Sequence, residues 1–202
     1  MSDGLLKSFL YKYLRFGTHN NKMIQDKVET PLQGALSVKV TNHETGESYY
    51  HVKDHNTITS IYKRNVVRLL GNNNVSGRII TKMKFGSEGH DPNNPGNPSP
   101  INAEMTALNN MFLTKQITTT SFEDDILNGI TSVIFEVVLT TAEGNGSGTQ
   151  IYSEAGLFTA DETPLVDPVS GLANTGMVAV KHFGVLTKTS ALSFTFQWRI
   201  LL

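Results

Sequence analysis

The C-terminal stretch SALSFTFQWRILL constrains the fold more than any other part of this sequence. From residue 192 to residue 200, large apolar side chains alternate with polar ones. A strict period of two places every second side chain on the same face of an extended chain, which is typical of a half-buried β-strand. The pattern therefore predicts a strand with one face in a hydrophobic core and with Trp198 in that core. The apolar set is Leu192, Phe194, Phe196, Trp198 and Ile200.

Strand patterns recur through most of the chain before this point. The runs ALSVKVT and SYYHVK flank the turn-rich segment NHETGE, which predicts a β-hairpin. Further strand patterns occur in RIITKMKF, in SVIFEVVLTTAEGNGSGTQIYSEAGLFTA with a glycine-rich hairpin tip, and in GMVAVKHFGVLTKT. We therefore predict a mainly β domain over residues 35–202, with about six to eight strands arranged as a β-sandwich or a flattened barrel.

One α-helix is predicted inside this β-rich domain, over the segment TITSIYKRNVVRLLG. Thr57 is a suitable N-cap, and Gly71 follows the last turn. The stretch INAEMTALNNMF can form a second, short helix. The apolar residues that share one face of the first helix are Ile58, Ile61, Tyr62, Val66, Leu69 and Leu70.

A proline- and asparagine-rich segment, GSEGHDPNNPGNPSP, separates these regions. It holds four of the seven prolines of the chain within a few residues. Neither a helix nor a central strand tolerates that density of proline, because proline lacks the backbone N–H that both structures use. We predict an exposed loop at residues 86–100.

The N-terminal residues predict a separate element, an amphipathic helix followed by an extended arm that reaches residue 34. Ser2 or Asp3 can cap the helix, and Gly17 can end it. Such a short helix needs a partner surface, which is either its own domain or a neighbouring subunit. We hypothesise docking on a neighbouring subunit. The side chains of the apolar face are Leu5, Leu6, Phe9, Leu10, Tyr13 and Phe16.

Composition excludes several classes of partner and chemistry. The formal net charge of −1 argues against a broad contact with nucleic acid. No apolar run approaches the roughly 18 residues that a membrane span requires, and Lys7, Lys12 and Arg15 interrupt the N-terminal run, so no secretion signal is predicted. The chain has no cysteine, which excludes disulfides, thiolate metal sites and cysteine nucleophiles.

No cofactor or metal ion is predicted. The sequence has neither a phosphate-binding GxxxxGK[ST] loop nor a GxGxxG turn after a strand. His51 and His55, with Asp54 between them and His43 upstream, have a spacing that suits zinc on a helix, but they fall at a predicted strand end, where the rings need not converge. The Glu88, His90 and Asp91 group lacks the oxygen-rich spacing of a calcium loop.

No catalytic residue is predicted either. The GxSxG nucleophile motif is absent from the sequence. The carboxylate pairs Asp124–Asp125 and Asp161–Glu162 fall in segments interpreted as loops, where solvated charges are normal.

The motif SEAGLF places the carboxylate of Glu154 beside an apolar cluster, which raises the question of whether this residue is catalytic or structural. Small residues follow it, so Glu154 and Gly156 predict a tight bend or bulge, after which Phe158 returns to the core. A carboxylate at such a bend accepts backbone N–H bonds and stabilises it. We interpret Glu154 as structural.

The order of short motifs between residues 57 and 202 resembles that of small structural proteins of tailed bacteriophages. A strand ending in Phe85-Gly86 precedes a variable proline-rich loop, the Glu154–Phe158 motif follows, and a Trp198-containing strand comes after Lys188-Thr189. The first 56 residues lie outside this resemblance.

The resemblance implies a non-enzymatic virion component present in many copies, bound to other virion subunits and to copies of itself in a symmetric homo-oligomer. A tail-associated position, at the baseplate periphery or at the attachment of a tail fibre, is the favoured expectation. A head-surface, neck or head-fibre protein is the alternative, and a receptor- or glycan-binding β-sandwich is a further one. Assembly in the host bacterial cytoplasm is consistent with the absence of cysteine.

Overall fold

The computed structural model describes residues 32–60, 62–63, 66, 79–125, 127, 130–163, 165–166, 173–174 and 176–201. The predicted N-terminal helix, its six apolar side chains and the arm as far as residue 31 lie outside the described residues. The first strand begins at Gln33, two residues before the predicted start of the β-rich domain.

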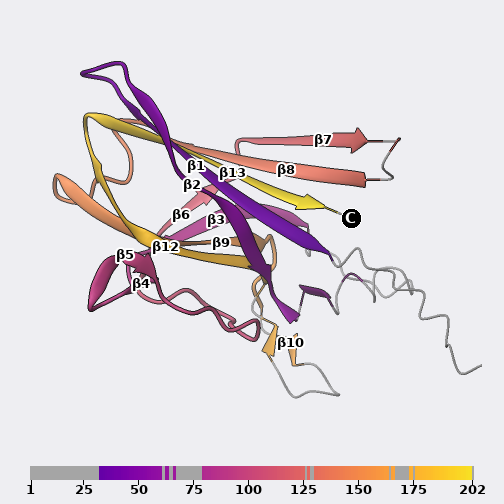
Figure 1. Ribbon diagram of the computed structural model, residues 1–202. Coiled ribbons are helices and arrows are strands. Elements are labelled where there is room, and N and C mark those ends of the chain that lie inside the picture. Colours follow the sequence, from indigo (N-terminus) through magenta and orange to yellow (C-terminus); the bar gives the residue numbers. More distant parts are fainter. Residues whose placement is uncertain are drawn as a thin grey trace, which may run out of the picture. The chain divides into compact units, whose positions relative to one another are not determined.

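The described part of the chain is mainly β (Figure 1). In chain order the strands are β1 (Gln33–Asn42), β2 (Ser48–Ile58), β3 (Ile80–Gly86), β4 (His90–Asp91), β5 (Asn94–Pro98), β6 (Met111–Gln116), β7 (Thr119–Asp125), β8 (Ile130–Leu139), β9 (Thr149–Thr159), β10 (Leu165–Val166), β11 (Ala173–Asn174), β12 (Met177–Thr189) and β13 (Leu192–Leu201).

Nine of these strands form one antiparallel sheet in the order β6-β3-β9-β12-β2-β1-β13-β8-β7. The sheet curls, so that its β6-β3-β9-β12 half faces its β1-β13-β8-β7 half. Strand β2 joins the two halves. It pairs with β1 over most of its length, and Thr57 and Ile58 at its end pair with Val180 and Ala179 of β12.

A second connection lies at the opposite edges of the sheet, where β6 and β7 follow one another in a single extended segment. The backbone N–H of Ile117 donates to the carbonyl oxygen of Thr81 at 2.9 Å, on the β3 side. The N–H of the next residue, Thr118, donates to the carbonyl of Glu136 on β8, also at 2.9 Å. Strands that switch sheets in this way form the corners of sandwiches and barrels. The expected sandwich- or barrel-like β architecture is therefore confirmed.

The main hydrophobic core lies between the two halves. The ring centroids of Phe85 on β3 and Phe196 on β13 are 4.6 Å apart, although their strands are distant in the order of the sheet. Tyr152 on β9 and Phe194 on β13 make a T-shaped contact at 5.6 Å. The predicted half-buried strand is confirmed as β13, and Trp198 is fully buried.

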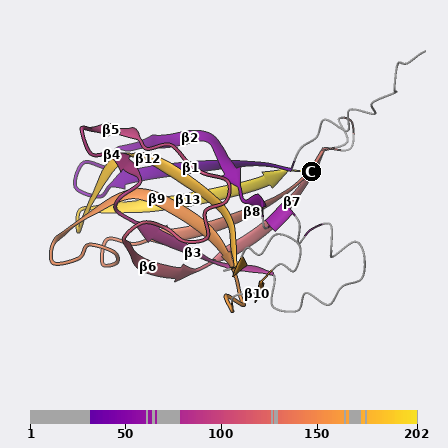
Figure 2. The ribbon, with the colours of Figure 1, turned by 90° about the horizontal axis from the view of Figure 1, so that it is seen from below.

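The proline-rich segment is exposed at β5, as predicted, but the expectation that it contains no strand was wrong. Strands β4 and β5 form a small hairpin in which His90 pairs with Pro98. A two-stranded hairpin tolerates proline because each strand keeps one edge free of ladder hydrogen bonds. Figures 1 and 2 show this hairpin beside β12. The contact is close, since a methyl carbon at Gly184 of β12 would lie 2.2 Å from the carbonyl oxygen of Gly96.

The predicted embedded helix is not established within the described residues. Thr57, its predicted cap, lies in β2, because the strand continues to Ile58 to pair with β12. The chain turns after β2 at Thr59. The hydroxyl of Thr59 accepts from the backbone N–H of Tyr62 at 3.3 Å, and its carbonyl oxygen accepts from the backbone N–H of Lys63 at 3.2 Å. Most of the following residues lie outside the described part, so this helix stays a prediction.

The second predicted helix, in INAEMTALNNMF, is absent. Residues 101–110 form turns and irregular structure, and Met111 begins β6. The segment is fixed by packing against the sheet, which overrides its weak local helical pattern. Within the described ranges, no helix combines the length and the apolar content that a membrane span requires.

Candidate functional site

Glu154 lies in the middle of strand β9 and is fully buried. It pairs with Gly86 of β3 on one side and with His182 of β12 on the other. The tight bend predicted at Glu154 and Gly156 is therefore wrong, since β9 runs through both residues. Irregular pairing, the bulge-like alternative, lies in the partner strand β12, between Met177 and Ala179 and between His182 and Leu186. Small residues in this motif serve close packing rather than a change of chain direction.

Gly156 and Gly86 provide the space that this packing requires. A methyl carbon at Gly86 would lie 2.2 Å from Oε1 of Glu154, and one at Gly156 would lie 2.9 Å from the ring of Phe158. Neither glycine has a positive φ angle. The requirement at both positions is therefore space and not backbone conformation.

The segment between β3 and β6, residues 87–110, crosses the outer face of β9 and β12, and we call it the strap. Beneath it lies a second, smaller hydrophobic core in which Phe158 is buried, as predicted. Apolar side chains of the strap pack on apolar side chains of the sheet. The members of this second core are Leu108, Phe158, Met177 and Val180, with Ile101 and Met105 packed against them.

A buried pair of a carboxyl group and an imidazole joins the sheet to the strap. Oε2 of Glu154 lies 3.5 Å from Nε2 of His182, and both side chains are almost fully buried. The backbone N–H of Asn109 donates to Oε2 of Glu154 at 3.0 Å. Nδ1 of His182 lies 3.1 Å from the carbonyl oxygen of Ser99. Because a carbonyl oxygen only accepts, Nδ1 carries a proton and donates. The pair thus contacts both ends of the apolar part of the strap.

Ser153 and His90 form a second polar contact with the strap. The hydroxyl of Ser153 accepts from the N–H of Gly89 at 2.9 Å and lies 3.1 Å from Nδ1 of His90. A serine beside a histidine is the starting arrangement of a nucleophilic site. Here the serine is fully buried, and a methyl carbon at Gly89 would lie 2.4 Å from its carbonyl oxygen. The strap therefore rests directly on Ser153, and the contact positions the strap.

Lys188 forms a third buried polar centre, at the end of β12. Its ammonium group donates to the carbonyl oxygens of Thr140, Thr189 and Leu192, at 2.9, 3.1 and 2.6 Å, and to Oδ1 of Asn145 at 2.8 Å. Burial lowers the pKa of Lys188. One ammonium thus ties the β8–β9 loop to the β12–β13 turn. Sequence patterning alone did not reveal this role, since a lysine between two threonines usually indicates a solvated strand face.

The glycine-rich stretch after β8 is a loop, but the predicted hairpin is wrong, because β8 pairs with β13 and β7 whereas β9 pairs with β12 and β3. The hydroxyl of Tyr152 donates to the carbonyl of Gly144 at 2.9 Å, and Gly144 has a φ of 67°, which glycine adopts without strain. In the same loop, Glu143 forms an ion pair with Lys115 and accepts from the N–H of Thr140 at 3.1 Å. The bonds to Lys115 and to Thr140 lower the pKa of Glu143 to about 2.

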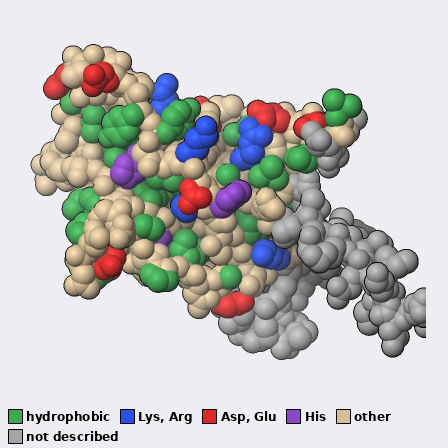
Figure 3. Space-filling model, in the orientation of Figure 1, with side chains coloured by type: hydrophobic (Ala, Val, Ile, Leu, Met, Phe, Trp, Pro, Cys, Tyr) green, Lys and Arg blue, Asp and Glu red, His purple; other side chains and the backbone are tan. Residues whose placement is uncertain are grey.

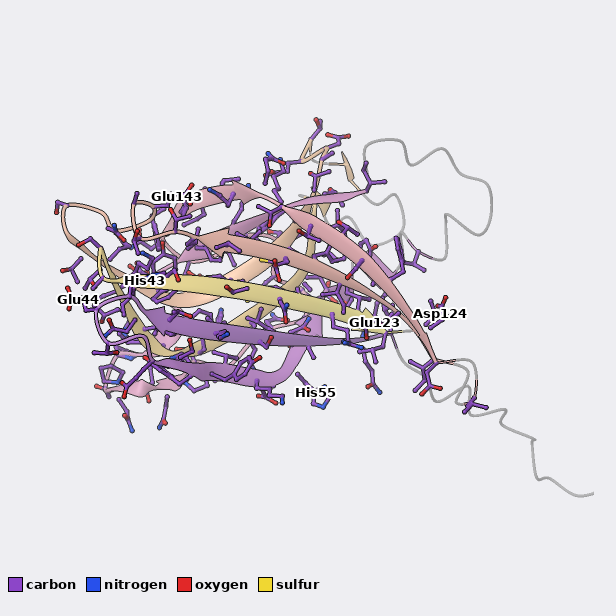
Figure 4. The ribbon with its side chains drawn as sticks, turned by 90° about the horizontal axis from the view of Figure 1, so that it is seen from above. His43, Glu44, His55, Glu123, Asp124 and Glu143 are labelled. Carbon is purple, nitrogen blue, oxygen red and sulfur yellow. The ribbon has the colours of Figure 1, made fainter. Side chains whose placement is uncertain are left out.

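The residues considered as metal ligands make contacts with other groups. Nε2 of His51 lies 3.1 Å from the carbonyl oxygen of Gly184, and a carboxylate oxygen of Asp54 accepts from Lys181 at 2.7 Å. Figure 4 shows His43 and His55 well separated from one another. In the part of the chain that the structure describes, no three His, Cys, Asp or Glu side chains form a group that could hold a metal ion.

The residues of the rejected calcium group and of the acidic pairs also make separate contacts. His90 contacts Ser153, and Asp91 accepts from the N–H of Asn93 at 2.8 Å. Asp124 lies in the exposed strand β7 rather than in a loop. Glu162 forms ion pairs with Lys82 and Lys84 of β3.

An open groove of about 400 Å³ lies on the outer face of β2, β1, β13 and β8. Tyr50 is more than half exposed beside it, and Lys53 lies 5.7 Å above the tyrosine ring. Figure 3 shows positive, negative and apolar side chains interspersed over the visible face of the molecule. The groove is lined by Ala35, Leu36, Ser37, Tyr50, Lys53, Asp54, His55, Ile134, Gln197 and Arg199.

Fold and site together define a mainly β protein in which buried ionisable groups tie loops to the sheet. No protein-family model and no curated protein matches this chain.

Proposed function

We propose that this protein is a non-enzymatic structural component of a tailed-phage virion, in a tail-associated position at the baseplate periphery or at a tail-fibre attachment. One observation carries the proposal: most residues of the motifs that resemble phage proteins are buried, and two of them hold loops in place. Glu154 binds the strap, and Lys188 binds two loops. Rigid loops on a β framework suit a subunit that is packed repeatedly against others.

The proposed partners are other virion subunits and further copies of this chain in a symmetric assembly. The N-terminal residues supply the contact in this proposal, through the six apolar side chains from Leu5 to Phe16. Burying such side chains contributes several kcal/mol before ordering costs, and repetition around a ring adds avidity. A head-surface, neck or head-fibre position remains the alternative, and both positions place the protein in the virion after assembly in the bacterial cytoplasm.

Deleting residues 1–16 tests the docking role. We expect the shortened protein to stay folded and soluble but to be missing from particles of a phage that encodes it, as measured by mass spectrometry of purified virions. Phe9→Asp, on the apolar face, should have the same effect, whereas Lys12→Ala on the polar face should still assemble. Unfolding of the shortened domain would contradict the docking role.

Immunogold labelling of wild-type particles tests the position. Label at the tail supports the favoured proposal, and label at the head or neck supports the alternative. Complete absence of the wild-type protein from purified virions would contradict both.

A glycan-binding role is a second candidate, and the open groove beside the exposed Tyr50 favours it. A pocket of this size that combines an aromatic ring with polar groups is typical of small-ligand sites. Binding to an array of bacterial surface glycans, lost in Tyr50→Ala but kept in Tyr49→Ala, would support this role. The absence of binding to any glycan on the array would exclude this role for the glycans tested.

A further inference from the structure

The hydrogen-bond geometry around Glu154 and His182 indicates how many protons the two side chains hold together. Nδ1 of His182 donates to the carbonyl of Ser99, so one proton is fixed there. A neutral imidazole would then present the lone pair of Nε2 to a carboxylate oxygen 3.5 Å away, which is repulsive. One further proton on either His182 or Glu154 removes the repulsion. In both arrangements the pair has no net charge and holds the same number of protons.

Nothing else among the described residues compensates a change in this count. Oε1 of Glu154 and Nε2 of His182 have no hydrogen-bond partner there, and both side chains are shielded from water. A buried charge without a partner destabilises the arrangement that buries it. A gain or a loss of one proton therefore leaves one uncompensated charge beneath the strap.

Neighbouring ionisable groups are already engaged with other partners. Lys84 on β3, whose side chain lies on the same face as Gly86, pairs with Glu162. His90 on β4 contacts Ser153, and Lys181, the neighbour of His182, bonds to Asp54.

We propose that Glu154 and His182 form a proton-dependent latch that holds the strap closed only while the pair carries its one shared proton. Loss of that proton leaves a buried carboxylate, and gain of a second leaves a buried imidazolium, so the strap opens at both ends of the pH range. Opening separates Leu108 from Phe158 and uncovers the second hydrophobic core. The latch does not depend on the proposed virion role.

Hydrogen exchange measured by mass spectrometry tests the latch on the full-length protein. Exchange of peptides from residues 99–110 is followed from acid to alkaline pH and corrected for the intrinsic pH dependence of exchange. One linked proton changes the opening equilibrium by about tenfold per pH unit beyond each transition. We expect the exchange of strap peptides to rise in this way at both acid and alkaline pH, which gives the profile an acid limb and an alkaline limb. Peptides from β13 should stay protected, which shows that the domain remains folded.

Two substitutions separate the latch from a merely structural contact. In Glu154→Gln, the amide oxygen accepts from Asn109 and the amide NH₂ donates to Nε2 of neutral His182, so the strap should stay closed at neutral pH and lose its alkaline limb. In His182→Gln, the carboxylate of Glu154 has no cation, so the strap should open at neutral pH and close on acidification. Glu136→Gln, whose carboxylate accepts from Gln197 on the outer face, is the matched control.

The wild-type profile decides the proposal even if a variant fails to fold. Strap exchange that does not change with pH while β13 stays protected would overturn the latch. So would equal loss of protection in strap and β13 for both folded variants, because that pattern describes loss of global stability.

Discussion

The ammonium of Lys188 donates a 2.8 Å hydrogen bond to the side-chain oxygen of Asn145 from a fully buried position. Three backbone carbonyl oxygens complete its surroundings. The lysine therefore acts as an internal cation that holds two loops in place. In this β protein, loop conformation depends on a few buried polar centres as well as on apolar packing.

Replacing Lys188 by methionine should destabilise the protein. The change removes the charge but leaves buried carbonyl oxygens without donors, at a cost of about 2–4 kcal/mol in the free energy of unfolding. Denaturant unfolding measures the effect. Lys53→Met, at an exposed lysine on the outer face, is the matched control and should change stability by less than about 0.5 kcal/mol. Equal stability of both variants would show that the carbonyl cage contributes nothing.

Trp198→Ala should cost about 3–5 kcal/mol, because it leaves a large cavity between the two halves of the sheet. The indole N–H is buried and has no hydrogen-bond partner among the described residues. Trp198→Phe removes that donor, so it should cost much less than the alanine change. Gln197→Ala, on the exposed face of the same strand, is the control in denaturant unfolding. A melting temperature unchanged in Trp198→Ala would contradict the core position.

Glu143 should make stability depend on acid pH. Its pKa is about 2 in the folded protein, against an ordinary value of 4.5, because Lys115 and Thr140 bond to the carboxylate. A lowered folded pKa adds stability above the unfolded value, and this contribution is lost as the pH falls from about 4.5 through about 2.

The melting temperature of Glu143→Gln should therefore lie below that of the wild type at neutral pH, and the difference should shrink towards pH 2. The carboxylate is partly exposed, so solvent screening keeps the effect modest. Glu44→Gln, in the β1–β2 turn, is the control; Figure 4 shows both carboxylates. A difference that is constant with pH would indicate that charge plays no part.

Gly86→Ala should disturb the attachment of the strap. The added methyl group would meet Oε1 of Glu154 and, at 2.5 Å, the carbonyl oxygen of Asn109, and a backbone contact of that kind cannot move freely. A loss of about 1–3 kcal/mol is expected in denaturant unfolding. Gly96→Ala is the matched control, because a methyl carbon there would have only an ordinary contact with Asn94. Similar stability in both variants would contradict the close approach of Glu154 to Gly86.

The alternation from Leu192 to Ile200 determined a half-buried strand from the sequence alone, because a period of two can satisfy only an extended chain with one covered face. It also placed Trp198 in the core. The hairpin of β1 and β2 followed in the same way from two strand patterns and a polar turn. These features depend on residues that are close together along the chain, so the local sequence pattern is sufficient to predict them.

Only the tertiary structure decided the role of Glu154. Small residues after it fit a turn or a close packing surface equally well, and the choice came from Gly86 and the strap, which are distant along the chain. The same holds for Thr57, which stays in β2 because β12 offers it a partner. Lys188 is buried because carbonyl groups of two separate loops converge on it. These contacts join residues that are far apart in the sequence and form only in the folded state. No local sequence pattern can therefore predict them.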